Sequence, residues 1–217
     1  MKIIVFFLVF AVLLCAGTGV FAQKDKIVYD FEQSNDGWDI PGWSFDRGYI
    51  GTYFGKTLNL SMEKASSGDH SLALVSDFPG YDWSCAIIEK TVNLDLTGYE
   101  TISVDVYVSK GAPTLLQAQI ILTVGDARKF VEMKNPGPLK PGQWTTIKAR
   151  LESPPSPGSE EEPSNTSDFR GRGPRRLYNN IDKVEKVAVR IEYNSAPPNM
   201  IGPRYGRPIY IDNFVIE

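Results

Sequence analysis

Cysteine and histidine are almost absent from this sequence. Two of its 217 residues are cysteine and one is histidine. Cys15 lies in an apolar N-terminal run, which leaves Cys85 alone in the rest of the chain. A single cysteine cannot form an internal disulfide, and zinc sites need cysteine and histidine ligands that this chain does not have. The fold must therefore be held by packing, with or without a bound ion of another kind.

Long apolar runs are missing beyond the N-terminus. The run from Ile3 to Cys15 is too short to span a bilayer comfortably, and Val20-Phe21-Ala22 follows it. These features are typical of a secretory signal peptide, so we expect residues 1–22 to be removed. The remainder, 23–217, is then a single domain, secreted or periplasmic and not an integral membrane protein. A lipoprotein signal at Cys15 is the alternative, although Leu14 is a poor fit to the small residue that such processing requires.

Excess positive charge is also missing. The formal net charge is −3 at pH 7. A mildly acidic chain has no bulk attraction for nucleic acid or for anionic membranes, so we expect no nucleic-acid partner. A catalytic triad would have to be built around His70, and no glycine-rich phosphate loop is present, so no catalytic residue is predicted. Paired carboxylates alone leave a small polysaccharide-active hydrolase or lyase as an alternative.

Helical periodicity does not persist for three turns anywhere, and strand patterns replace it. The stretch from Thr101 to Val108 alternates strictly between apolar and polar residues. Other predicted strands are 26–31, 58–62, 71–75, 86–92, 116–123, 129–133, 144–150, 187–193 and 209–216. Turn signals such as Ser67-Gly68-Asp69 and Gly125-Asp126 separate them. The sequence therefore predicts an all-β protein, an antiparallel β-sandwich or jelly roll.

One segment has a different composition. Residues 152–176 read ESPPSPGSEEEPSNTSDFRGRGPRR, with an acidic cluster before a basic one. Such a segment buries too little apolar surface to order itself, so we expect a low-complexity surface loop inserted between two strands. The alternative is a lid that closes over a ligand and contributes its arginines.

The order of several short motifs resembles the galactose-binding-like jelly-roll group of carbohydrate-binding modules. The motifs are Tyr29-Asp-Phe-Glu32 with Gly37-Trp38, Ser67-Gly-Asp-His-Ser-Leu-Ala-Leu74, Leu94-Asp-Leu-Thr-Gly-Tyr-Glu-Thr-Ile-Ser-Val-Asp-Val-Tyr107, Pro141-Gly-Gln-Trp144 and Ile209-Tyr-Ile-Asp-Asn-Phe-Val-Ile216. The resemblance covers nearly all of residues 23–217. It implies a secreted, non-catalytic domain that binds a polysaccharide or oligosaccharide as a monomer. A structural or envelope-associated sandwich that binds protein is the alternative.

The same resemblance implies a structural calcium ion between the two ends of the chain. The group's ligand positions match Glu32, the turn from Ser67 to His70, and Asp212. Carboxylates and backbone carbonyls are the oxygens that calcium prefers. In the alternative, Glu32 and Asp212 are hydrogen-bonded carboxylates without a metal.

Polar side chains on the outer faces of three predicted strands suggest a sugar-binding groove. They are Asp105, Tyr107, Gln117, Gln119, Arg190 and Glu192; that the three strands are neighbours is taken from the family's fold. Stacking rings are expected from Trp83, our first choice, and Tyr81. Trp43, Phe45, Tyr49, Tyr53 and Phe54 are further aromatic candidates, whereas Trp38 is expected to be structural. The alternative is a solvated face with ordinary cross-strand pairs.

Overall fold

Ten strands make up the regular structure of the residues that the structure describes. A computed structural model describes residues 24–45, 52–80, 83–133, 138–151, 180–194 and 202–217. The strands are β1 (Ile27–Tyr29), β2 (Gly55–Ser61), β3 (Ser71–Ser76), β4 (Ser84–Leu94), β5 (Thr101–Tyr107), β6 (Leu116–Val124), β7 (Lys129–Met133), β8 (Trp144–Arg150), β9 (Val184–Tyr193) and β10 (Ile209–Ile216). The described ranges contain no helix, so none in them could cross a membrane. The prediction of an all-β fold is confirmed.

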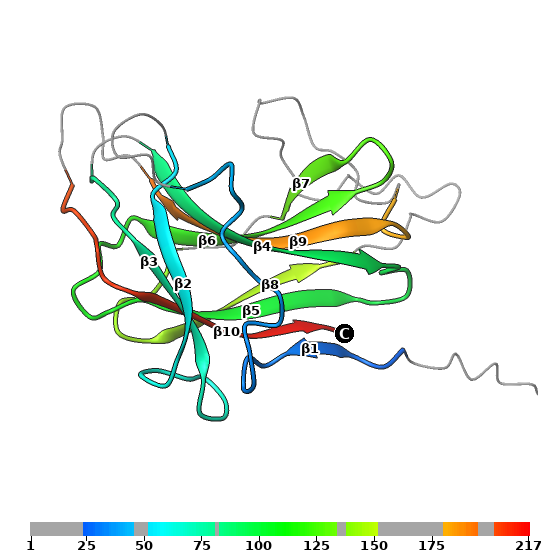
Figure 1. Cartoon of the computed structure of the whole chain (residues 1–217), viewed down its shortest axis with the longest axis horizontal. Helices are drawn as coiled ribbons and strands as arrows, with labels where there is room; N and C mark the ends of the chain where they lie inside the picture. Colours follow the sequence, from blue (N-terminus) through cyan, green and yellow to red (C-terminus); the bar gives the residue numbers. More distant parts are fainter. Residues whose placement is uncertain (1–23, 46–51, 81–82, 134–137, 152–179, 195–201) are drawn as a thin grey trace, which may run out of the picture.

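Two antiparallel sheets face each other as a sandwich (Figure 1). The six-stranded sheet has the order β2-β3-β10-β5-β8, with β1 paired to β10. The four-stranded sheet has the order β4-β9-β6-β7. Strands β5 and β6 follow each other in the chain but belong to different sheets, so the chain crosses between the layers as a sandwich requires.

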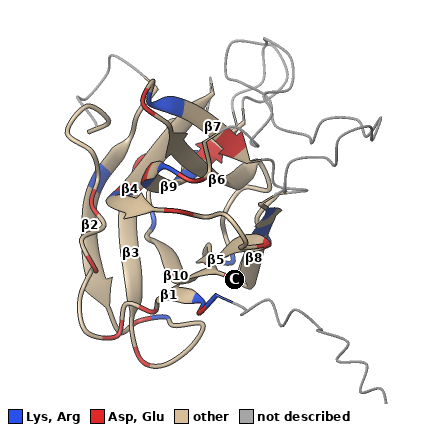
Figure 2. Cartoon of the chain, turned by 90° about the vertical axis from the view of Figure 1, so that its right-hand side faces the viewer, with Lys and Arg blue, Asp and Glu red and all other residues tan. Residues whose placement is uncertain are grey.

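The core lies between the sheets because each strand turns every second side chain inward. On β5 the inward residues Ile102, Val104 and Val106 are fully buried, and on β9 Val187 and Val189 are. Figure 2 shows the two layers from the end, with charged positions marked along the strands and turns. Each outer face is thus left for other contacts.

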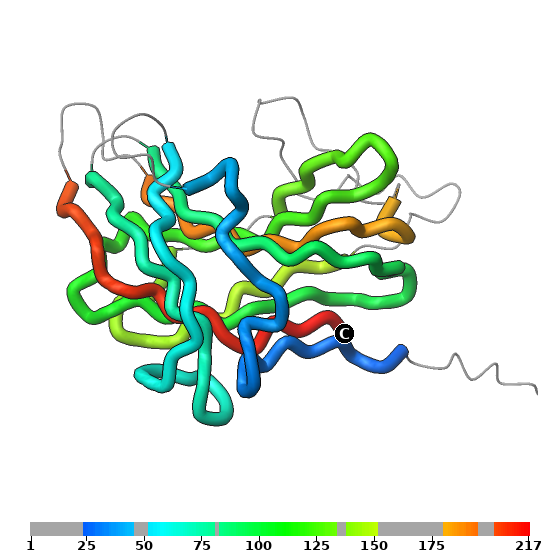
Figure 3. The backbone as a smooth tube through the Cα atoms, in the orientation of Figure 1, coloured from blue at the N-terminus to red at the C-terminus, as the bar shows by residue number. Residues whose placement is uncertain are grey.

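The two ends of the described chain lie side by side. Strand β1 pairs with the last strand, with Ile27 opposite Ile216, and Figure 3 shows the C-terminus next to the start of the blue tube. Trp38 is fully buried and packs on Phe214 at 4.9 Å between ring centroids. This agrees with its predicted structural role. The expected signal segment 1–22 and the insertion 152–176 lie outside the described residues, and so do Tyr49 and Tyr81.

Candidate functional site

Four of the predicted binding residues share one face of the molecule, the outer face of the four-stranded sheet. In the register of β9 with β6, Glu192 lies opposite Gln117 and Arg190 lies opposite Gln119. Both pairs point away from the core, because Ile191 between them is fully buried on the inner side. The prediction that strands 116–123 and 187–193 are neighbours is therefore correct.

Arg190 holds this face together. Its Nη1 lies 2.7 Å from Glu132 Oε1, and its Nη2 donates to Gln119 Oε1 at 2.6 Å. Its Nε donates to Glu192 Oε1 at 2.6 Å. Burial alone would lower the pKa of Arg190, but the Glu192 and Glu132 carboxylates outweigh it and raise that pKa. The guanidinium is therefore permanently charged, and it fixes three acceptor side chains.

A pocket of about 300 Å³ opens beside Arg190. It is lined by Trp43, Tyr53, Phe130, Glu132 and Arg190. The ring of Trp43 stands edge-on to that of Tyr53 with the centroids 5.2 Å apart, yet Trp43 remains 49% exposed. An exposed indole next to a buried ion pair gives the pocket one apolar wall and one polar wall.

The aromatic wall is held by the segment that leads from β1 to β2. Asp39 forms a bridge to Glu89, and Tyr53 forms one to Cys85, both along the free edge of β4. The Phe54 N–H donates to the Cys85 carbonyl at 2.8 Å. These backbone bonds cover the open edge of the sheet and anchor the chain on both sides of Trp43.

Trp83, the first-choice stacking residue, lies next to the network but does not line the pocket. Its ring centroid is 5.6 Å from Arg190 Cζ, which is the geometry of a cation–π contact. Tyr81 lies outside the described residues. Trp83 is partly buried, so the structure places it as a packing partner of the guanidinium at the margin of this face.

Asp105 and Tyr107 are not part of this face, which corrects the grouping predicted from the sequence. They lie on β5, which belongs to the six-stranded sheet, between β10 and β8. Their side chains point outward from the opposite layer of the sandwich. The assumption that strand 101–108 adjoins strands 116–123 and 187–193 is wrong because β5 joins the six-stranded sheet, whereas β6 and β9 join the four-stranded one.

Sequence analysis missed Glu132 and Phe130. They alternate with the buried Val131 on β7 and so point outward, beside β6. The alternation in Phe130-Val131-Glu132 was visible in the sequence. What was not visible is that Arg190, two strands away, reaches Glu132.

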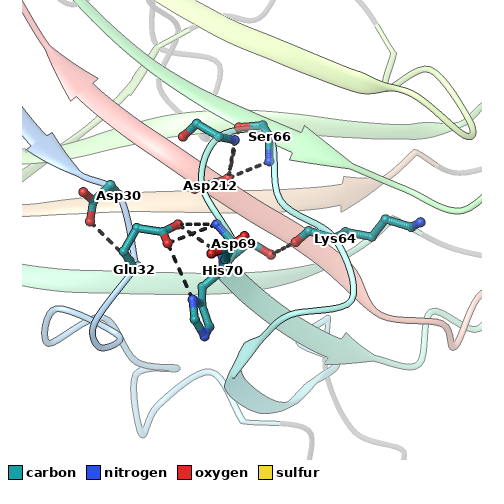
Figure 4. Close-up of polar contacts among 9 residues, drawn as sticks. Asp30, Glu32, Lys64, Ser66, Asp69, His70 and Asp212 are labelled. Atoms are coloured by element: carbon teal, nitrogen blue, oxygen red, sulfur yellow. Dashed lines mark hydrogen bonds and ion pairs between the residues drawn. The ribbon is translucent and has the colours of Figure 1, made fainter.

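The residues predicted to bind calcium form a clasp around the turn from Ser66 to His70 (Figure 4). Glu32 accepts hydrogen bonds from the backbone N–H groups of Asp69 and His70, both at 3.1 Å to Oε1. Asp212 Oδ2 accepts from the N–H groups of Ser66 at 2.7 Å and Ser67 at 3.2 Å. The two carboxylates therefore tie both chain ends to one turn.

This arrangement does not fit a calcium site. Calcium needs oxygen ligands, but both carboxylates are faced mainly by backbone N–H donors, and the Ser66 hydroxyl itself donates to Asp212 Oδ2. In the part of the chain that the structure describes, no group of three or more acidic, cysteine or histidine side chains is placed to hold a metal. Calcium binding itself is not tested by these contacts, so it stays a prediction.

Comparison with known proteins gives the fold alone. Neither a family model nor a curated protein matches the chain. It is similar to carbohydrate-binding modules of the β-sandwich superfamily, described for promiscuous specificity, at 14% identity and a TM-score of 0.53, over 87% of this chain and 61% of that one. A family 22 module from Clostridium thermocellum gives 13% identity and a TM-score of 0.49, over 88% and 91%. A module described for mannan recognition gives 14% and 0.47, over 89% and 98%.

Proposed function

We propose that the chain is a secreted, non-catalytic glycan-binding domain and that sugar binds in the pocket beside Arg190. One observation carries the proposal: the half-exposed ring of Trp43 and the Arg190–Glu132 ion pair line the same pocket. The β-sandwich and its similarity to carbohydrate-binding modules support it.

The aromatic wall suits the apolar part of a sugar. A pyranose ring presents a patch of C–H groups, which packs on the polarised face of an indole or phenol. Trp43 offers such a face, and Tyr53 supports it from the side. Phe130 adds apolar surface to the same pocket. A sugar unit that enters this pocket would thus meet aromatic rings.

The polar wall suits hydroxyl groups. Glu132 lines the pocket, and the guanidinium that holds it also fixes Glu192 and Gln119 on the same outer face, so their positions need little further ordering when a ligand binds. Carboxylates accept hydrogen bonds from hydroxyls, and these bonds are stronger than neutral ones. Two carboxylates around one arginine leave an excess of negative charge, which favours neutral over acidic polysaccharides.

The same contacts argue against catalysis at this site. A glycosidase needs one carboxyl that gives up a proton and a second that attacks or activates water. Here Glu132 is the one carboxyl among the described residues that line the pocket. A second carboxyl facing it across the pocket is not among those residues.

A structural or protein-binding sandwich is the second candidate. It is favoured by the burial of the Arg190–Glu132 pair, whose side chains are only 8% and 7% exposed. A closed ion pair stabilises the sheet whether or not a ligand binds. The half-exposed ring of Trp43 favours the glycan hypothesis instead, since ring and pocket together offer a surface on which a sugar unit can pack.

The test is binding of the purified protein to a panel of polysaccharides by affinity gel electrophoresis. Xylan and mannan come first, because solved structures of similar fold are described as binding or recognising them, and alginate represents acidic chains. We expect binding to a neutral polysaccharide, weakened roughly 5- to 150-fold by Trp43→Ala. Val28→Ala, an exposed apolar residue on β1, is the matched control. Absence of binding across the panel would favour the structural candidate.

A further inference from the structure

Three aromatic residues form a row on the outer face of the other sheet. In the register, Tyr210 on β10 lies opposite Tyr107 on β5, and Tyr107 lies opposite Trp144 on β8. The ring centroids are 6.1 Å and 5.6 Å apart. The neighbouring residues Val106 and Ile211 are buried in the core, so the row faces away from it. These rings therefore do not fill the space between the sheets.

One end of the row is more buried than the rest. Tyr210 is 7% exposed, while Tyr107 and Trp144 are both partly exposed. Trp144 belongs to β8, the edge strand of the sheet. Tyr210 and Tyr107 thus support Trp144 from one side. Adjacent strands lie about 4.8 Å apart, which is comparable with the length of one sugar unit.

Fixed polar groups accompany the row. Asp105 lies beside Tyr107 on the same face and accepts hydrogen bonds from Ser66 Oγ at 2.9 Å and Thr146 Oγ1 at 2.5 Å. Lys64 Nζ lies 5.7 Å from the centre of the Tyr107 ring. The exposed Glu63 accepts a hydrogen bond from the Tyr210 hydroxyl. The face therefore combines a ring, a cationic donor and oriented carboxylate acceptors.

We propose that this second face, formed by Trp144, Tyr107, Asp105 and Lys64, is an additional glycan-binding surface. The ring of Trp144 would stack on a sugar unit, Asp105 would accept from a hydroxyl and Lys64 would donate to one. The class of ligand rests on the proposed function; the location does not.

The position of the second face would allow the protein to cross-link polysaccharide chains. The outer faces of two packed sheets point in opposite directions. A protein with one binding site on each can hold two polysaccharide chains at once and cross-link them. A protein with the Arg190 pocket alone cannot. Cross-linking therefore separates a two-faced binder from a one-faced one.

Five purified proteins test the inference: wild type, Trp43→Ala, Trp144→Ala, the double variant and Trp144→Phe. Affinity gels with soluble xylan and galactomannan measure binding, and turbidity of the same polysaccharides measures cross-linking. We expect each substitution to weaken its own site by roughly 5- to 150-fold, the loss of a stacking ring, so each single variant still binds through the other site. We expect the double variant to lose binding, and either single variant to lose turbidity. Trp144→Phe keeps a ring and should retain most of both. Circular dichroism checks that each variant is folded.

The outcomes separate the two sites. If Trp43→Ala abolishes binding and Trp144→Ala changes neither binding nor turbidity, the second face is not a site and the pocket stands. If Trp144→Ala abolishes binding and Trp43→Ala changes nothing, the second face stands and the pocket is wrong. If wild type binds no polysaccharide, both are overturned.

Discussion

Arg190 reaches across strand β6 to Glu132, with 2.7 Å between Nη1 and Oε1. Arg190 lies on β9 and Glu132 on β7, and β6 runs between them. The small Ala188 and the buried Ile121 and Ile87 form an apolar cluster on this same outer face. A long cationic side chain is thus held flat over one sheet, where it orders the polar wall of the pocket.

Removal of Arg190 should destabilise the protein strongly. Arg190→Met leaves Glu132 and Glu192 buried or half-buried without their counter-charge. The expected loss of unfolding free energy is about 3–5 kcal/mol, as for other broken buried pairs. Urea unfolding measures it. Lys148→Met is the matched control, because its pair with Glu217 is 53% and 47% exposed and should contribute at most about 1 kcal/mol. Equal effects of the two substitutions would contradict the assigned role.

Trp83 should affect stability and binding together. Its contact with the Arg190 guanidinium is a cation–π interaction, whose loss in Trp83→Ala should cost about 0.5–2 kcal/mol. Affinity should fall as well, because Arg190 positions the pocket's acceptors. Trp83→Phe keeps a ring and should restore part of both. Calorimetric melting and affinity gels on the same samples measure the two effects. A drop in affinity with no change in melting would instead identify Trp83 as a ring that contacts sugar directly.

The strands were predictable because each carries a local alternation. The stretch from Thr101 forms β5, and the residues from Ile209 to Ile216 form β10 as expected. The first strand is shorter than predicted, since Phe31 takes a positive φ of 57° and ends it. The second is longer, since Gly55 and Thr57 pair with β3 through an irregular register.

The arrangement of the strands was not predictable from such local signals. The partners of β5 are β8 and β10, which lie far away in the sequence. Their pairing is decided by which layer each strand joins, and alternation does not encode that. This is why Asp105 and Tyr107 were grouped with Arg190 although they lie on the opposite face. The contact of Arg190 with Glu132 likewise depends on which strands share a sheet, and local alternation does not encode that.

Cys85 should be unreactive in the folded protein. Cys85 is fully buried, and this burial raises the pKa of its thiol to about 12. Only the thiolate reacts with alkylating reagents, so N-ethylmaleimide at pH 8 should label Cys85 slowly in buffer and readily in urea. Peptide mass spectrometry locates the label. Thr57→Cys, at an exposed position of β2, is the positive control. Labelling of native Cys85 as fast as that control would mean that this edge of the sheet opens.

Glu32 should give the protein part of its acid sensitivity. Hydrogen bonds from the Asp69 and His70 N–H groups lower the pKa of Glu32 below its ordinary value of 4.5. Its stabilisation is present above that value and is lost as the pH falls through the lower pKa of the folded state. The pKa of Asp212 is raised, chiefly by burial, so its contribution has the opposite sign and favours the folded state at low pH. Melting temperatures between pH 7 and pH 3 should therefore fall less in Glu32→Gln than in wild type. If the melting temperatures of wild type and Glu32→Gln fall equally with pH, Glu32 does not contribute to the acid sensitivity.

A chelator experiment tests whether Glu32, Asp212 and the turn from Ser66 to His70 hold a calcium ion. Bound calcium predicts that a chelator lowers the melting temperature of the wild type and does nothing to Asp212→Ala. The hydrogen bonds predict a different pattern, because the carboxylates of Glu32 and Asp212 already accept backbone N–H groups. We expect chelator to leave the wild type unchanged.

Asp212→Ala should still destabilise the protein in the presence of chelator. It removes the acceptor of the Ser66 and Ser67 N–H groups, and each donor left unsatisfied costs about 1–3 kcal/mol if it stays buried. Differential scanning calorimetry with EGTA, and with added calcium as the reverse arm, measures both effects. A fall in the wild-type melting temperature that calcium reverses would show that the turn from Ser66 to His70 rearranges, with carbonyl oxygens replacing N–H groups around the two carboxylates.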